Sequence, residues 1–169
     1  MLQTMDPKCL TENVFSLLDD RWALLTAGTP EDCNTMTVSW GGVGILWNKP
    51  VVTVYVRPQR HTHRFMETSD CFTLTFFGEG ERREALSLCG SKSGREMDKF
   101  SAAGLTVAVS ADGVPYPGEG ELVLVCRTLY RQEMESRCFL DEDIRRKNYP
   151  NEDYHTMYVG EIVEVLKRN

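Results

Sequence analysis

The sequence predicts a mainly β fold, an antiparallel barrel or sandwich with short helical insertions. About six or seven segments have the alternating or β-branched composition of strands. The helical segments between them are short, and strands and helices do not alternate regularly, as they would in a parallel doubly wound sheet. With 169 residues, 41% of them hydrophobic, the chain can bury a substantial core, and we expect one domain over residues 1–169.

The N-terminal half is expected to begin with a helix and to continue mainly as strands. Thr11 can cap a helix that runs through Asp20. Pro58 disfavours a helical conformation at the preceding residue, so a loop is expected there, followed by a helix that Thr62 caps and that ends near Thr68. Strands are predicted at 22–28, 35–40, 50–56 and 71–77, with turns at 29–32 and at the glycine-rich segment 41–44.

The C-terminal half is expected to contain an interrupted helix and three more strands. The helix covers 81–88, breaks at 89–94 and resumes over 95–103, where Gly104 ends it. A charged, irregular loop is expected over 141–153, and long loops in compact domains are usually functional or mobile. The remaining strands are predicted at 105–109, 121–130 and 158–166, with a turn-rich segment at 112–118.

Charge and cysteine usage exclude several classes of protein. Nineteen basic residues against 25 acidic ones give a net charge of −6, which argues against a nucleic-acid partner. No apolar run is long enough to span a membrane, and the N-terminus lacks the features of a signal peptide, so we expect a cytoplasmic protein without a membrane partner. The cysteines are widely spaced and are expected to be free thiols: Cys9, Cys33, Cys71, Cys89, Cys126 and Cys138.

The strand predicted at 35–40 carries an unusual row of hydroxyl groups. Thr35, Thr37 and Ser39 would share one face, which is poor core material but can hydrogen-bond a flat polar ligand. The other face would carry Met36, Val38 and Trp40. The glycine-rich turn that follows would let the backbone approach a ligand closely.

Two segments have the composition of a phosphate site. A phosphate group favours cations, hydroxyls and backbone amides at the N-terminus of a helix. The first segment is Arg57, Gln59, Arg60 and Thr62, and the second is Ser91, Lys92, Ser93 and Gly94 before a helix from Arg95. Taken singly, each is also typical of a solvated turn or of ordinary capping. The P-loop and the dinucleotide-binding glycine motifs are absent.

Other candidate residues have a structural explanation as well as a functional one. His61, His63 and His155 could bind a metal, but no paired carboxylates accompany them and exposed imidazoles are the simpler reading. Cys89 could be a reactive thiol or a small buried residue. We therefore predict no metal ligand and no catalytic side chain.

Four segments, in order, carry a family resemblance. They are Asn34-Thr35-Met36-Thr37-Val38-Ser39-Trp40-Gly41, residues 54–62 (VYVRPQRHT), residues 91–100 (SKSGREMDKF) and residues 155–162 (HTMYVGEI). Over about Trp22 to Val165 the chain resembles the flavin reductase-like family of FMN-binding split barrels, which includes flavoredoxin-like proteins.

The resemblance implies a six-stranded antiparallel Greek-key split barrel, a homodimer and FMN near the subunit interface. The implied cofactor-binding residues are Thr35, Met36, Thr37, Val38, Ser39, Trp40, Arg57, Gln59, Arg60, His61, Thr62, Cys89, Gly90, Ser91, Lys92 and Ser93. Residues 138–153 match no part of the family pattern. They could form a lid that brings Tyr149, Tyr154 or His155 near the flavin, or an exposed charged loop.

The resemblance also implies an oxidoreductase that passes electrons from NADH or NADPH through FMN to an acceptor. The cofactor carries such chemistry, so no acid–base pair is required of the protein. The alternative is a non-enzymatic FMN-binding electron carrier. A third possibility is a relative on the same barrel that binds haem or pyridoxal phosphate.

Overall fold

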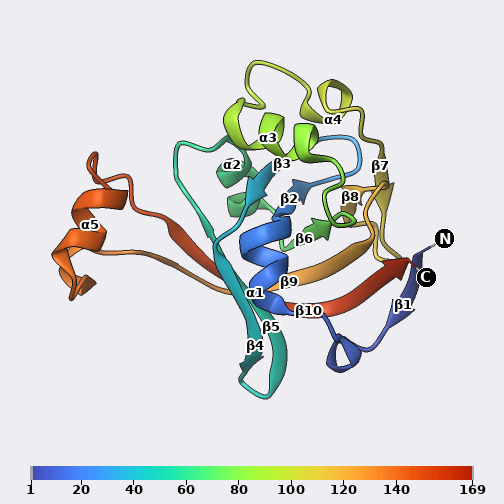
Figure 1. Ribbon diagram of the computed structural model, residues 1–169, viewed down its shortest axis with the longest axis horizontal. Coiled ribbons are helices and arrows are strands. Elements are labelled where there is room, and N and C mark those ends of the chain that lie inside the picture. Colours follow the sequence, from blue (N-terminus) through green and yellow to red (C-terminus); the bar gives the residue numbers. More distant parts are fainter. Residues whose placement is uncertain (1, 169) are drawn as a thin grey trace.

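The computed structural model describes residues 2–168, and one antiparallel sheet of eight strands runs through it (Figure 1). The strand order is β3-β2-β6-β9-β10-β5-β4, with β1 paired to β10, and β7 pairs with β8 in a separate small sheet. The strands are β1 Leu2–Met5, β2 Ala23–Gly28, β3 Cys33–Val38, β4 Gly41–Leu46, β5 Lys49–Val56, β6 Cys71–Phe76, β7 Val107–Val109, β8 Pro115–Pro117, β9 Leu122–Glu133 and β10 Thr156–Arg168. The predicted mainly β class is confirmed, with more strands than the six expected.

Short helices fill the connections between the strands. Asparagine and aspartate side chains cap several of them: Asn13 accepts hydrogen bonds at the start of α1, Asp98 at α4 and Asp141 at α5. The helices are α1 Val14–Ser16, which continues as a π-helical turn over Leu17–Arg21, α2 His61–Thr68, α3 Arg83–Ser91, α4 Lys99–Ala102 and α5 Glu142–Asn148, with 3₁₀ turns at Pro7–Cys9 and Ser136–Cys138. None of the described helices is long and apolar enough to cross a membrane.

Two predicted helix caps are wrong. The helix near Thr11 begins only after Asn13, whose side chain accepts from the amides of Phe15 and Ser16. Thr62 lies inside α2, and its hydroxyl accepts a hydrogen bond of 2.7 Å from Asn34 Nδ2. The N-cap residue of α2 is Arg60, and no side chain of the described residues caps that helix.

The sheet separates two apolar clusters. Because side chains alternate along a strand, β2 directs Leu25 into the barrel interior beside Leu74 and Tyr158, and Leu24 to the opposite face. There α3 covers the sheet with Leu86 and Cys89. This packing holds the C-terminal end of α3 against β3.

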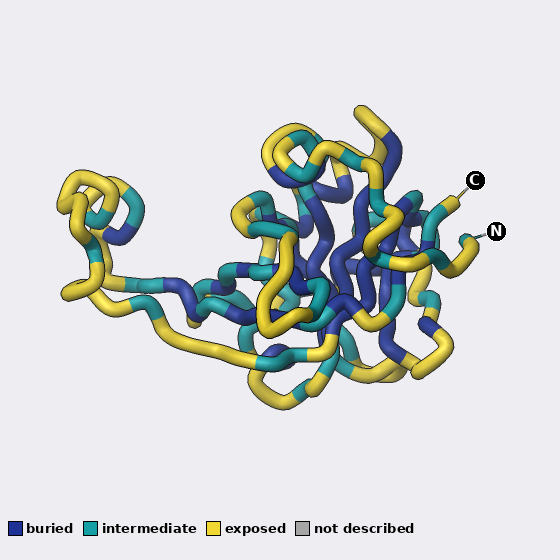
Figure 2. The backbone as a smooth tube through the Cα atoms, turned by 90° about the horizontal axis from the view of Figure 1, so that it is seen from below, coloured by how far each residue is buried: buried dark blue, intermediate teal, exposed yellow. Residues whose placement is uncertain are grey.

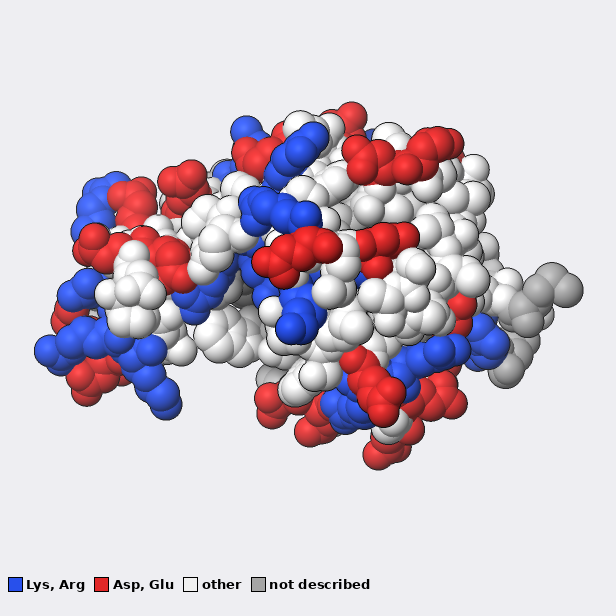
Figure 3. All heavy atoms as spheres, turned by 90° about the horizontal axis from the view of Figure 1, so that it is seen from above, with Lys and Arg blue, Asp and Glu red and all other residues white. Residues whose placement is uncertain are grey.

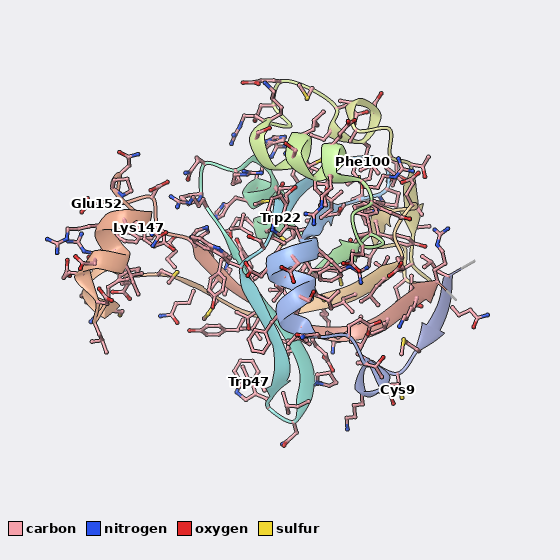
Figure 4. All side chains as sticks on the ribbon, in the orientation of Figure 1. Cys9, Trp22, Trp47, Phe100, Lys147 and Glu152 are labelled. Atoms are coloured by element: carbon pink, nitrogen blue, oxygen red, sulfur yellow. The ribbon has the colours of Figure 1, made fainter. Side chains whose placement is uncertain are left out.

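The glycine-rich segment 41–44 is a strand, β4, and not the predicted turn. It pairs with β5 in register from Gly41 opposite Val54, and a Cβ at Gly41 would lie 2.5 Å from the carbonyl oxygen of Thr53. The turn falls instead at Trp47 and Asn48, which have φ of 51° and 59°. Two successive positive φ angles match the right-handed twist of a tight hairpin. Trp47 thus lies at the tip of this hairpin (Figure 4).

Other element boundaries differ from the predictions because tertiary packing overrides local signals. Trp22, with φ 63°, precedes β2 and does not belong to it. The α3 helix continues through the predicted break to Ser91 because Cys89 is fully buried in the cluster beneath it, and only the short α4 follows. The turn-rich segment 112–118 contains β8.

Residues 134–155 form an arm that projects from the barrel between β9 and β10 (Figures 1 and 2). The arm contains α5, where the sequence predicted an irregular loop. Figure 2 shows that most of the arm is exposed while the strands of the barrel are buried. Acidic and basic side chains are intermixed on the face of the arm that Figure 3 shows.

Candidate functional site

A cleft of about 190 Å³ opens where the end of β3, the end of β5 and the base of the arm meet. Residues from β3 and the connection to β4 form one wall. Arg57 and Arg60 follow β5, and His155 precedes β10. The lining consists of Met36, Thr37, Val38, Ser39, Trp40, Tyr55, Arg57, Arg60 and His155.

The hydroxyl row on β3 is only partly available to a ligand. Thr35 is fully buried, donates to the Leu25 carbonyl at 3.2 Å and accepts from Thr26. Thr37 lines the cleft, but its hydroxyl donates to the carbonyl oxygen of Leu86. Ser39 also lines the cleft, and its hydroxyl forms no hydrogen bond with the described residues. The wall therefore offers backbone groups and one hydroxyl, and not the three hydroxyls expected.

Two cations meet the C-terminal carbonyls of α3: Arg60, which lines the cleft, and Lys99, which lines a separate cavity. Arg60 donates to the carbonyl oxygens of Gly90 at 2.6 Å and Cys89 at 2.9 Å. Lys99, which is only 3% exposed, donates to the carbonyl oxygens of Cys89 at 2.8 Å and Thr35 at 3.0 Å. Carbonyls at a helix C-terminus carry partial negative charge and stabilise cations.

The charge of this pair is not compensated by a carboxylate among the described residues. Burial, and next the charge of Arg60, lower the pKa of Lys99 to about 8. Burial also lowers the pKa of Arg60. Both remain cationic at neutral pH and contact only neutral oxygens. Arg60 lines the cleft and can meet an anion there, while the buried Lys99 adds positive charge behind it.

The segment 91–94 does not form the predicted helix N-terminus. It follows the C-terminus of α3, where the helix dipole opposes an anion, so that part of the prediction is wrong. Ser91 donates to the Ser87 carbonyl at 2.8 Å, and Lys92 is exposed. Gly90, just before this segment, packs against the cleft residue Thr37, and an added Cβ at Gly90 would lie 3.4 Å from the Thr37 side chain.

Arg57 and Gln59 turn toward the arm. Arg57 forms an ion pair with Asp153 and donates to the Asn148 carbonyl at 2.7 Å. Gln59 donates to the same Asp153 carboxylate at 2.6 Å. The Arg57 guanidinium also lies 5.0 Å from the ring centre of Tyr149, within cation–π range. These contacts fix the base of the arm beside the cleft.

An aromatic group completes the arm side of the cleft. His155 Nδ1 lies 2.7 Å from the Tyr149 hydroxyl, and its ring centre is 5.5 Å from that of Trp40 and 6.3 Å from that of Tyr55. Burial, and next the charge of Arg57, lower the pKa of His155 to about 4, so the imidazole is neutral at pH 7. Of the three lid residues considered, His155 lines the cleft and Tyr149 supports it.

His61 and Thr62 are further predicted site residues that lie away from the cleft. His61 faces a different cavity, beside Asp32, Cys33 and Asp98, with its Nδ1 unpaired. Thr62 is buried, and its hydroxyl accepts a hydrogen bond from Asn34. The three histidines do not converge, and residues 2–168 contain no cluster of three potential metal ligands.

Sequence reasoning missed Tyr55, Lys99 and Asp153. Tyr55 and Lys99 both lie in segments that carry the family resemblance, but neither was predicted to bind a ligand. Asp153 sits in the charged loop, whose contact with Arg57 spans 96 positions of sequence. Only long-range contacts identify these three residues.

The cleft fits a flat ring with an anionic tail. Trp40, Tyr55 and His155 offer aromatic surface, and the wall from Met36 to Trp40 offers backbone groups. Arg60 offers a positive charge that no carboxylate of the described residues compensates. Fold and site thus define a split-barrel protein with a cleft for a planar, phosphorylated ligand.

Residues 16–169 match the model of the flavin reductase like domain, and the chain belongs to that family. The predicted cofactor, FMN, is confirmed at the level of the family, which binds flavin.

Known proteins similar to this chain include a rubredoxin and FMN proteins. A high molecular weight rubredoxin of Moorella thermoacetica is 34% identical over 67 residues, which are 40% of this chain and 28% of that protein, so the match spans about a quarter of the relative. An FMN-binding protein from Thermus thermophilus with bound p-hydroxybenzaldehyde has a TM-score of 0.69 at 20% identity, covering 99% of this chain and 82% of that one. Flavoredoxin from Methanosarcina acetivorans has a TM-score of 0.66 at 22% identity, covering 88% and 69%. At these identities the structural likenesses show the fold.

Proposed function

We propose that the cleft holds FMN and that the protein is an oxidoreductase that passes electrons from NADH or NADPH to an acceptor. The observation that carries this proposal is Arg60, a cation with no carboxylate partner among the described residues, in an aromatic cleft of a chain of the flavin reductase-like family. When bound, FMN supplies the hydride- and electron-transfer chemistry.

The chain's own residues bind and orient the cofactor. Arg60 holds the phosphate through its remaining N–H groups, and the buried charge of Lys99 behind it adds to the attraction for a dianion. The backbone from Met36 to Trp40, with Ser39, hydrogen-bonds the polar edge of the ring system. Trp40 and Tyr55 pack against its apolar part and exclude water, and neutral His155 supports this side without adding charge.

A second copy of the chain would complete the site. The cleft is smaller than the roughly 300–1,000 Å³ typical of ligand pockets, so one subunit covers only part of the cofactor. Trp47 on the hairpin is 56% exposed and Leu140 on the arm is fully exposed, which suits a homodimer interface. Light scattering coupled to size exclusion tests the dimer. All six cysteines are free, in keeping with a cytoplasmic location.

The rival function is an FMN-binding electron carrier without a nicotinamide reaction. The similarity to a flavoredoxin and a rubredoxin supports it. Anaerobic stopped-flow reduction of the FMN-loaded protein by NADH and by NADPH separates the two. The oxidoreductase requires faster reduction of bound FMN than of free FMN at equal concentration. Equal or slower reduction leaves the carrier, and a protein that binds no FMN contradicts both.

A further inference from the structure

A second cavity, of about 250 Å³, lies at the base of the arm next to the cleft. Tyr55 lines both, so the two cavities share one side chain as a common wall. The lining of the second cavity consists of Tyr55, Gln132, Glu133, Met134, Glu135, Cys138, Phe139 and Met157. The cofactor assignment above uses none of these residues except Tyr55.

The floor of this cavity is a row of three side chains across the sheet. Met157 on β10 pairs with Tyr55 on β5 and with Gln132 on β9. Directly paired residues on neighbouring antiparallel strands place their side chains on the same face. The three side chains therefore form a continuous surface in which the aromatic ring and the thioether are adjacent.

The wall of the cavity comes from the first part of the arm and is held in place by other aromatic residues. The Phe139 ring lies 5.5 Å from that of Tyr149 and 5.7 Å from that of Tyr154. The Tyr149 hydroxyl lies 3.7 Å from the sulfur of Met134. Because Tyr149 also contacts His155 in the cleft, one residue supports the walls of both cavities.

The chemistry of the lining selects an uncharged, flat ligand. Tyr55 and Phe139 offer aromatic surface, while Met134 and Met157 are flexible and polarisable and adapt to different ring shapes. At the rim, Glu133 forms no ion pair with the described residues, and Glu135 pairs with Arg137. The Glu133 carboxylate makes the rim unfavourable for an anion.

We propose that this cavity binds a small neutral aromatic molecule, immediately beside the cleft and across Tyr55 from it. Binding needs only the residues of this cavity. The use of such a molecule as the substrate class of the enzyme rests on the proposed function, because only then does its position beside the cofactor cleft matter.

Two variants distinguish this cavity from the rest of the surface. Cys138→Trp places a large side chain in the cavity from an exposed position at the end of the 3₁₀ turn Ser136–Cys138. Cys9→Trp makes the same change at an exposed cysteine that also ends a 3₁₀ turn. Figure 4 shows Cys9 far from the arm, which carries Lys147 and Glu152.

The experiment is calorimetric titration of the full chain with 2-naphthol, which is neutral at pH 7, and with the anion 2-naphthoate. It is done without FMN and again with FMN loaded. We expect one naphthol per chain in both states and at least tenfold weaker binding of naphthoate. Naphthol affinity should fall at least tenfold in Cys138→Trp and stay unchanged in Cys9→Trp.

Three results would overturn the proposal. They are no saturable binding of naphthol, equal affinity in the two variants, and competition between naphthol and FMN, which would place the ring in the cleft. A second copy of the chain seated over the cavity would give the first result, together with a change of oligomeric mass in Cys138→Trp. A protein that binds naphthol as expected but binds no FMN would contradict the proposed function and leave this cavity's ligand in place.

Discussion

Arg57 and Arg60 are three residues apart and both line the cleft, yet only the charge of Arg57 is compensated by a carboxylate of the described residues. Arg57 pairs with the carboxylate of Asp153, so its charge is largely compensated within the protein. Arg60 contacts the carbonyl oxygens of Cys89 and Gly90, which satisfy its N–H groups without cancelling its charge. A buried lysine beside it is held in the same way.

The difference shows that the partners of a cation decide whether it can serve a ligand. Carbonyl partners position the guanidinium and leave a net positive charge, whereas a carboxylate makes it part of the scaffold. Arg60, with the buried charge of Lys99 behind it, then forms the anion site, and Arg57 anchors the base of the arm.

The largest expected effect is on FMN binding in Arg60→Ala. Loss of a charge-assisted hydrogen bond costs on the order of 1.5–3 kcal/mol, which is roughly 10- to 150-fold in affinity. FMN should lose that much in fluorescence titration and riboflavin much less. The matched variant Arg57→Ala should affect the two ligands about equally.

Arg60 also holds the end of α3, so thermal unfolding of each variant must be compared as a control. Arg60→Lys keeps the charge and should retain most of the preference for FMN over riboflavin. An equal loss for both ligands in Arg60→Ala, with the fold intact, would rule out the phosphate assignment.

The next effect is a pH dependence that Lys99 should impose on the same preference. As pH rises through about 8, Lys99 loses its proton, and the FMN-to-riboflavin affinity ratio should fall by roughly tenfold, about 1.4 kcal/mol. Lys99→Met should flatten this profile. The exposed Lys92→Met variant should not, and a larger effect at Lys92 than at Lys99 would favour the sequence-based site over the structural one.

The same lysine affects folding. Its pKa is lower in the folded state than the ordinary 10.5, so the unfolded chain binds the proton more tightly. Above pH 10.5 Lys99 is neutral in both the folded and the unfolded chain, and the free energy of unfolding is highest. As pH falls from 10.5 to about 8, the unfolded chain takes up the proton first, and the free energy of unfolding decreases. Urea unfolding of wild type and Lys99→Met, at pH 7.5 and pH 10, should therefore differ in its pH dependence.

On the arm side, His155 should make the fold sensitive to acid. Its folded pKa of about 4 lies below the ordinary 6.5, so the unfolded chain takes up the proton first. Stability should fall by up to about 1.4 kcal/mol per pH unit between pH 6.5 and 4. His155→Gln should reduce this slope in urea unfolding, and an unchanged slope would mean that the imidazole is protonated without cost.

The smallest expected effect concerns the contact between Asp153 and Arg57. Asp153→Asn removes the ion pair, and amide hydrogen exchange across residues 134–155 should become a few-fold faster, because the pair is partly solvated. Asp143→Asn, which disrupts an exposed pair with Arg146 on α5, is the control and should change little. Equal amide exchange rates in the two variants would show that the pair between Arg57 and Asp153 does not anchor the arm.

Much of the fold could be predicted from local patterns. The β-branched run at 50–56 and the alternating C-terminal segment are strands in the structure, because alternation follows directly from the geometry of a half-buried sheet. The glycine-rich segment 41–44 misled because glycine favours turns locally. Here it permits close approach of β4 to Thr53, a reason that only the partner strand supplies.

By itself the sequence determined the strand pattern, the class of the fold and the segments rich in cations and hydroxyls, since these depend on side-chain chemistry and spacing along the chain. The tertiary structure decided that α3 ends, and does not begin, beside the cleft. It also decided that the hydroxyls of Thr35 and Thr37 donate to carbonyl oxygens within the protein. Lys99 contacts the same helix-end carbonyl as Arg60, whereas Arg57 forms an ion pair with Asp153. The physical reason is that the charge available at a site is what remains after every partner is counted, and those partners come from distant parts of the chain.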